Sequence, residues 1–198
     1  AGIQIAIAPG EARLARARPV NPETHEVCLK GRWYVDKYSM QGFSKAKECF
    51  ELALEKDPNY APAYAWLGMS CGGPGYWGYM RPREIWPKAK EAALKAVELD
   101  DTLGEAHFAL AGCSYYFDWD WPAAEMGFKR AIELNPNFPE ARHSYSFYLI
   151  TMGRLDEAMA EGKRAVELDP LNLVGMAIAA MPLLVAHRYE EAIEEIQK

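Results

Sequence analysis

The chain has 198 residues, of which half are apolar and a quarter are charged, so it is long enough for one sizeable domain or a short solenoid of ordinary soluble composition. Its formal net charge of −6 argues against a nucleic-acid surface, because such a surface needs clustered Lys and Arg to displace counterions. No run of 18 apolar residues occurs, so the sequence predicts no membrane-spanning helix.

Residues 1–23 have a pattern of their own. Ile3, Ile5 and Ile7 alternate with other residues, which is typical of a short strand, and Pro9 and Gly10 end that pattern. Residues 11–17 then favour a short helix. We interpret 1–23 as a linker or the tail of a preceding domain, because the alternating isoleucines have no strand partner without one.

A short string recurs through the rest of the chain. It reads Ala-Leu-Glu-Lys-Asp-Pro from Ala53 and Ala-Val-Glu-Leu-Asp-Pro from Ala165, with related strings from Ala96 and Ala131, at spacings of 43, 35 and 34 residues. A further alanine precedes each string by seven residues and returns at Ala192. An apolar stripe of this spacing predicts a helix. The Asp-Pro or Asn-Pro that follows in three units predicts its end, because proline disfavours helical geometry in the residue before it.

A second apolar stripe precedes each of these helices, so each unit predicts a pair of helices. One position of this stripe is small in four units, which lets the partner helix approach closely. These small residues are Gly68, Ala111, Ser146 and Ala180.

This pattern resembles the tetratricopeptide repeat, a helix pair of 34 residues. The resemblance covers about residues 27–198, within a repeat array that we assign to residues 24–198, and it implies an all-α, right-handed superhelical solenoid of about five repeats. We place the repeats at 27–60, 61–103, 104–138, 139–172 and, incomplete, 173–198. The chain departs from the family pattern at Trp33 and Tyr34 in unit one, at Asp101 in place of proline in unit two, and at Gly162 in place of an aromatic residue in unit four.

A finer resemblance rests on 18–22, 29–32 and the Asp-Trp-Asp-Trp motif at 118–121. These segments are similar to the repeat region at the C-terminal end of some bacterial multidomain signalling and regulatory proteins. Such proteins carry an output domain before the repeats, namely a winged-helix DNA-binding, nucleotide-cyclase or kinase domain. The resemblance implies that this chain is the regulatory arm of a larger protein.

Unit two carries nine extra residues between its helices, within residues 72–86. Gly and Pro predict an irregular connection over the first half of this stretch. Because aromatic and arginine side chains are enriched at binding hot spots, one interpretation is a contact surface. Its residues are Tyr76, Trp77, Tyr79, Arg81 and Arg83. The other interpretation is a loop folded over the neighbouring repeat.

The turn of unit three predicts a helix start. Asp120 is placed to cap the following helix, with Pro122 in the first turn. We expect Trp119 and Trp121 to pack over this turn against the adjacent helices.

The sequence contains no motif of a catalytic or cofactor site. It lacks a phosphate-binding glycine loop, His-Glu-x-x-His and Gly-x-Ser-x-Gly. Stacking of units three and four brings His107 near His143, but two histidines alone do not make a metal site. We interpret the scattered cysteines as small core residues in a reducing compartment. They are Cys28, Cys49, Cys71 and Cys113. The chain is therefore expected to be no enzyme and to hold no cofactor and no metal.

In the family, the first helices of consecutive repeats line a concave groove that holds the ligand. Carried onto this chain, the resemblance implies an aromatic and aliphatic groove with acidic positions such as Glu140 at one rim. The expected groove residues are Glu105, Phe108, Tyr115, Tyr116, His143, Phe147, Ile150 and Met181. The clamp for acidic chaperone tails is not expected, because Gly31 and Val35 stand at its positions.

The expected function is a protein–protein interaction scaffold that binds a protein or peptide, without nucleic acid and without membrane insertion. The expected location is cytoplasmic, or periplasmic if the full chain is membrane-anchored. Two alternatives stay open. The groove is filled by the chain's own residues, or the incomplete last repeat drives self-association through Ile193 and Ile196.

Overall fold

The computed structural model describes residues 21–197, which form helices and no strand. The expected strand and short helix within residues 1–17 lie outside this part. The helices, in chain order, are α2 Pro22–Val35, α3 Met40–Lys56, α4 Ala61–Tyr76, α5 Pro82–Leu99, α6 Gly104–Cys113, α7 Trp121–Leu134, α8 Pro139–Thr151, α9 Leu155–Leu168, α10 Leu173–Val185 and α11 Tyr189–Ile196. A π-helical turn, Ser114–Asp118, extends α6.

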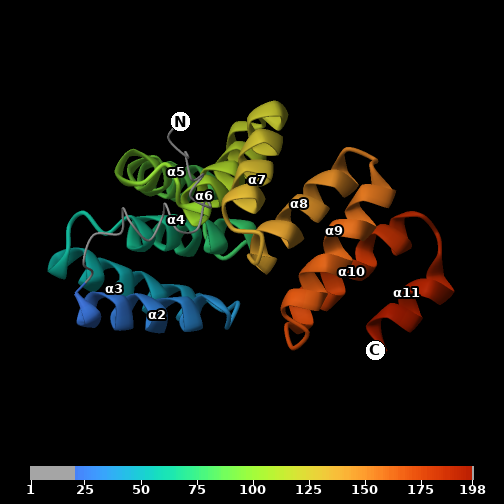
Figure 1. The fold of residues 1–198 in the computed structure, drawn as a ribbon, viewed down its shortest axis with the longest axis horizontal. Coiled ribbons are helices and arrows are strands. Elements are labelled where there is room, and N and C mark those ends of the chain that lie inside the picture. Colours follow the sequence, from blue (N-terminus) through green and yellow to red (C-terminus); the bar gives the residue numbers. More distant parts are fainter. Residues whose placement is uncertain (1–20, 198) are drawn as a thin grey trace, which may run out of the picture.

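The helices pack as five consecutive pairs, from α2 and α3 at one end to α10 and α11 at the other (Figure 1). In the central pairs, the first helix of one pair also contacts the first helix of the next, so that α4, α6, α8 and α10 form a continuous inner row. The all-α solenoid expected from the sequence is confirmed. Among the described residues, no helix is both long enough and apolar enough to cross a membrane.

The second helices of the first four pairs end where the repeated strings predict. In three of these helices the C-cap residue is followed directly by proline. These C-cap residues are Asp57, Asn135 and Asp169. Unit two lacks this proline, and there the side chain of Asp100 takes over. Its Oδ1 accepts hydrogen bonds from the backbone N–H of Thr102 at 2.9 Å and from its hydroxyl at 2.7 Å. This local turn competes with a further helical turn and ends α5.

The alanine stripe forms the packed inner line of the helix pairs. In the first four units both stripe alanines are fully buried, because only a side chain of this size fits where two helices cross closely. Phe50 and Phe128, which lie between them in units one and three, are also fully buried. The prediction from periodicity is therefore confirmed.

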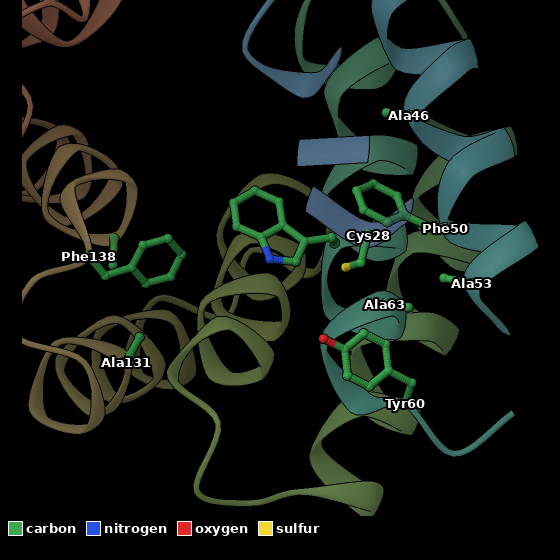
Figure 2. Packing of buried hydrophobic residues seen from close by; sticks show 10 residues of the cluster. Cys28, Ala46, Phe50, Ala53, Tyr60, Ala63, Ala131 and Phe138 are labelled. Atoms are coloured by element: carbon green, nitrogen blue, oxygen red, sulfur yellow. The ribbon is translucent and has the colours of Figure 1, made fainter. Parts of the chain in front are cut away.

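The largest core cluster joins pairs that are distant in the sequence. Figure 2 shows Phe50, Cys28 and Tyr60 from the first units on one side, with Phe138 on the other, its ring turned inward. The ring of Phe138 lies 6.2 Å from the indole of Trp66. The residue that precedes α8 is thereby packed against α4.

The insertion of unit two is not the irregular loop that Gly and Pro predict. The helix α4 continues through Gly72, Gly73, Pro74 and Gly75 to Tyr76, and only residues 77–81 connect it to α5. The glycines are needed for packing. A Cβ at Gly73 would lie 2.4 Å from Phe43 Cε1, and one at Gly72 would lie 2.8 Å from the ring of Trp86. The missing side chains let two aromatic rings lie against the helix, which offsets the low helix propensity of glycine.

The turn of unit three is predicted correctly at its cap and only in part at its tryptophans. Asp120 accepts a hydrogen bond from the backbone N–H of Ala123 at 3.1 Å, as an N-cap residue does. Trp121 packs on Tyr115, with ring centroids 5.5 Å apart. Trp119 contacts the edge of Trp121 but is 68% exposed, so it does not cover the turn. Its backbone adopts a left-handed φ of 60°, which is uncommon for a residue other than glycine.

Three of the four cysteines are core residues, as interpreted from the sequence. Cys28, Cys71 and Cys113 are buried, whereas Cys49 is partly exposed. Burial raises the pKa of the Cys28 and Cys113 thiols to about 12. These two thiols are therefore protonated at neutral pH, which is opposite to what a cysteine nucleophile requires.

Candidate functional site: a concave aromatic groove

A cavity of about 790 Å³ lies along the inner row of helices. Its lining comes mainly from the end of α2 and the connection to α3, from α4, from α6 with its π-helical turn, and from α8 and α10, with single residues of α3, α5 and α11. All five helix pairs therefore contribute to one surface. Its aromatic lining consists of Tyr38, Phe43, Trp66, Tyr76, Trp77, Trp86, Phe108, Tyr116 and Phe147.

The aromatic wall of the groove is held rigidly by ring contacts. Tyr116 stacks on Trp86 at 5.6 Å and meets the edge of Tyr76 at 5.0 Å. Tyr76 in turn lies 6.5 Å from Phe147. The part of the lining that belongs to α10 is aliphatic, and its Leu173 is 78% exposed. The groove thus presents preformed apolar surface to solvent.

Five of the eight groove residues expected from the sequence line the cavity. They are Phe108, Tyr116, His143, Phe147 and Met181. Glu105, Ile150 and Tyr115 do not line it. Tyr115 is buried instead, with its hydroxyl 2.5 Å from Oγ1 of Thr151, so it holds the π-helical turn against α8.

Of the five contact residues expected in the insertion of unit two, some line the cavity and others do not. Tyr76 and Trp77 line the cavity, one at the end of α4 and the other at the start of the connection. Tyr79, Arg81 and Arg83 lie outside the cavity lining, and Arg81 pairs with Glu84 on the surface at 3.5 Å. Tyr76 and Trp77 thus belong to the groove surface, whereas Tyr79 is about half exposed outside it and does not fold over the neighbouring repeat.

Sequence reasoning missed the contribution of the first two units. Asp36, Tyr38 and Trp66 line the groove together with residues of units three to five. The one available signal was the aromatic content of residues 33–38 and 64–77. The spacing of residues within a repeat carries no information on the curvature of the whole array, and this curvature brings the first unit close to the last.

The groove has an acidic end, where Glu140 and Asp36 line the cavity and Asp169 lies close enough to act on both. Burial raises the pKa of Glu140 to about 7, and the negative charges of Asp36 and Asp169 act in the same direction. Burial likewise raises the pKa of Asp36. Arg32 is the cation that lowers both pKa values, and its guanidinium also lies 4.4 Å over the ring of Trp66.

Two polar atoms at this end have no hydrogen-bond partner among the described residues. They are Oε2 of Glu140 and Nε2 of His143. His143 is only 5% exposed, and burial lowers the pKa of its imidazole to about 4, so the ring is neutral near pH 7. Buried polar atoms in native proteins are nearly always satisfied, which makes this pair unusual.

The two ends of the array approach each other beside these residues. Asn172 caps α10 by accepting a hydrogen bond from the backbone N–H of Gly175 at 2.9 Å. The same side chain hydrogen-bonds to Tyr38, whose pKa is raised mainly by burial and lowered in part by this bond. The connection after α2 thereby meets the connection before α10 across the groove.

The acidic end has no arrangement suited to a metal ion. Within residues 21–197, no three His, Cys, Asp or Glu side chains are grouped to hold one. His107 points elsewhere, since its Nε2 lies 2.8 Å from the carbonyl oxygen of Asp101. The chemistry available in the groove is therefore apolar contact, hydrogen bonding and charge.

The repeat unit itself can be compared with known proteins. A family model described as "Tetratricopeptide repeat" matches residues 128–160. The solved structure of TTC0263, a TPR protein of Thermus thermophilus, superposes with a TM-score of 0.65 at 19% identity and covers 87% of each chain. The chain has the fold of a tetratricopeptide repeat solenoid, and residues 128–160 match the repeat family itself. YrrB, described as a TPR protein with an unusual peptide-binding site, superposes at a TM-score of 0.50 with 23% identity, over 96% of this chain and 89% of YrrB.

One relative adds information beyond the repeat. The transcriptional regulator HilA of Salmonella typhimurium is 26% identical over 144 residues, which cover 73% of this chain and 26% of HilA. The tetratricopeptide repeat array thus spans about a quarter of the length of that relative.

Proposed function

We propose that this tetratricopeptide repeat array is a recognition module that binds a protein or peptide segment in its concave groove. The observation that carries the proposal is the cavity of about 790 Å³, whose walls combine fixed aromatic rings with exposed aliphatic side chains. Preformed pockets for ligands have volumes of roughly 300–1,000 Å³ and are mostly apolar with a few polar groups. The groove has these properties.

The proposed role is non-catalytic binding. The buried Cys28 and Cys113 thiols have a pKa of about 12, and the neutral His143 imidazole has a pKa of about 4. Groups with these pKa values are poorly suited to nucleophilic or general-base work near pH 7. Tetratricopeptide repeat proteins are typically scaffolds without enzyme activity, and the groove chemistry of this chain agrees with that role.

We further propose that the array is the regulatory arm of a larger bacterial signalling protein. The similarity to HilA supports this, because HilA is described as a transcriptional regulator and is about four times as long as the matched region. In this arrangement, occupancy of the groove would report on a partner to the rest of the protein.

Gly112 offers the sharpest test of the groove. It lines the cavity, and a Cβ added there would meet no atom within 4 Å. Gly112→Leu therefore places a side chain in the cavity without displacing the core, while Gly112→Ala is a control that leaves most of the space open. Random short peptides displayed on phage are selected on the chain, and their affinities for the two variants are measured.

The proposal predicts peptides that bind the chain and Gly112→Ala alike and lose about tenfold or more in affinity for Gly112→Leu. Selection that yields only peptides insensitive to residue 112 would contradict it. Melting temperatures of the three proteins, which are expected to agree closely, show that any loss is not caused by unfolding.

A second candidate function is self-association through α11. Ile193 is 56% exposed and Ile196 is 51% exposed on this helix. Exposed apolar side chains on one helix favour packing against a further apolar surface. Light scattering across a range of concentrations decides the point. A mass that rises with concentration in the chain and not in Ile193→Glu supports self-association, and a constant monomer mass excludes it.

A further inference from the structure

We propose that the groove selects a segment that carries a lysine or arginine among apolar residues, and that the cation enters the acidic end formed by Glu140, Asp36 and Asp169. The inference rests on the proposed function, because it names the class of partner that the groove takes. The basic side chain of the bound segment supplies the positive charge, and the apolar residues beside it in that segment pack on the aromatic wall of the groove.

The first argument is the unsatisfied hydrogen bonding at this end. Oε2 of Glu140 and Nε2 of His143 are buried without a partner among residues 21–197, although both side chains line the cavity. A carboxylate only accepts hydrogen bonds, and a neutral imidazole accepts one at its unprotonated nitrogen. An ammonium or guanidinium group brings several donors and no acceptor, so it can supply the hydrogen bond that Oε2 of Glu140 lacks.

The second argument is the charge balance. Three carboxyl groups act on one another at this end, and burial together with their mutual repulsion raises the pKa of Glu140 to about 7. The cation that acts on Glu140, Arg32, also lies over the ring of Trp66. An incoming cation would lower the repulsion between the carboxylates and favour the charged form of Glu140.

The third argument is the neighbourhood of the acidic end. Tyr38 lines the same cavity as Glu140, and aromatic faces attract cations in addition to apolar groups. The aliphatic stem of a lysine or arginine packs on such rings while its head reaches a carboxylate. An acidic segment would instead face like charges, which makes the groove selective by sign.

Glu105 provides a matched control for Glu140. Both residues stand second in the first helix of their repeats, and both have a buried Oε2 without a partner among the described residues. Only Glu140 lines the cavity. Glu105 lies outside it, where Asn135 Nδ2 donates to its Oε1 at 3.4 Å. Glu140→Gln and Glu105→Gln thus make the same chemical change inside and outside the groove.

The test uses random short peptides displayed on phage, selected on the 198-residue chain and sorted by their sensitivity to Gly112→Leu. Peptides that depend on the groove are expected to be enriched in Lys or Arg flanked by aliphatic and aromatic residues. Their affinity should fall about tenfold or more on Glu140→Gln and on replacing the basic residue by norleucine, as expected when a charged hydrogen bond is lost. Glu105→Gln should leave the affinity within about twofold.

Three results would overturn the inference. Groove-dependent peptides without basic residues, or with affinities unchanged by Glu140→Gln, reject the cation while leaving the proposed function in place. Equal losses on Glu140→Gln and Glu105→Gln mean that the effect is one of net charge rather than of this site. No groove-dependent peptide at all rejects the proposed function as well. Circular dichroism melting of each variant confirms that the compared proteins are folded.

Discussion

The imidazole of His143 occupies the space in which residue 175 would carry a side chain. A Cβ built at Gly175 would lie 2.2 Å from Cε1 and 2.5 Å from Nε2 of that ring. The absence of a side chain therefore lets α8 approach α10 closely enough for a buried histidine to lie directly against the first turn of α10. This contact lies beside Glu140 in the groove lining, and it depends on both residues.

Gly175→Ala is accordingly expected to lower stability by about 1–3 kcal/mol, because the added methyl group must displace a ring that is itself enclosed. Gly112→Ala is the matched control, since it adds the same group inside a helix where no atom lies within 4 Å. It should be neutral or stabilising by up to about 1 kcal/mol. Urea unfolding of both variants measures the difference. Equal stabilities would show that the ring moves away without cost.

Glu140→Gln is expected to stabilise the free protein at high pH. Burial raises the folded-state pKa of Glu140 to about 7 from an ordinary value of 4.5. The free-energy cost of burying its negative charge is therefore absent below pH 4.5 and complete above about pH 7. The variant should therefore gain roughly 2–3 kcal/mol near pH 8 and almost nothing near pH 4. The charged groups that act on Glu140 are Arg32, Asp36 and Asp169.

The same variant exposes the opposite pH dependence of His143. Its pKa is lowered from 6.5 to about 4 by burial, so its contribution is complete above 6.5 and is lost as the pH falls toward 4. In the unmodified chain, Glu140 and His143 offset each other between about 4.5 and 6.5. As the pH falls from about 6.5 to 4.5, the stability of Glu140→Gln should therefore decrease more steeply than that of the unmodified chain. Chemical denaturation at several pH values tests this, and parallel curves for the two proteins would contradict the assignment.

Glu125 is expected to matter for stability more than any other surface carboxylate of its pair of helices. Arg154 lies 2.6 Å away, Lys129 lies 2.8 Å away and the hydroxyl of Tyr145 donates at 3.1 Å. These hydrogen bonds lower the pKa of Glu125 to about 2, and the hydrogen bond from Arg154 has the largest effect. Its contribution is therefore present above 4.5 and is lost as the pH falls toward 2.

Glu125→Gln should cost about 1 kcal/mol at neutral pH, a moderate value because solvent screens the cluster. Glu167→Gln is the control, since within residues 21–197 Glu167 pairs with Arg164 of its own helix alone, at 2.9 Å in a well-exposed position. That change should be nearly neutral. Urea midpoints compare the two variants, and a control loss as large as that of Glu125→Gln would refute a special role for the cluster.

Tyr38→Phe removes the hydroxyl that bonds to Asn172 across the groove. The expected loss of stability is about 0.5–1.5 kcal/mol, the usual net worth of one hydrogen bond. Tyr79→Phe serves as the control, because Tyr79 is about half exposed in the connection between α4 and α5. Thermal melts of both variants are compared. A Tyr38→Phe protein as stable as the control would mean that the bridge contributes nothing in solution.

The repeat pattern predicts the structural features that depend on residues within one unit. It does not predict the features that depend on contacts between distant units. Alanine spacing and Asp-Pro ends locate the helices, because those signals act within a few residues. The helix through Gly72 and Gly73 was missed, since its glycines are compensated by rings of Phe43 and Trp86 from other helices. The place of Asp36 and Tyr38 in the groove was missed because it depends on the accumulated curvature of the array. Phe108 and Phe147 were found because they lie on the inner row itself.

The most direct test of the account is calorimetric titration of one groove-selected peptide into the chain, into Gly112→Ala and into Gly112→Leu. The account predicts one site per chain, nearly equal affinity for the first two proteins, and a loss of about tenfold or more for Gly112→Leu at unchanged melting temperature. Undiminished binding to Gly112→Leu would contradict it, because the peptide would then occupy a surface other than the concave groove.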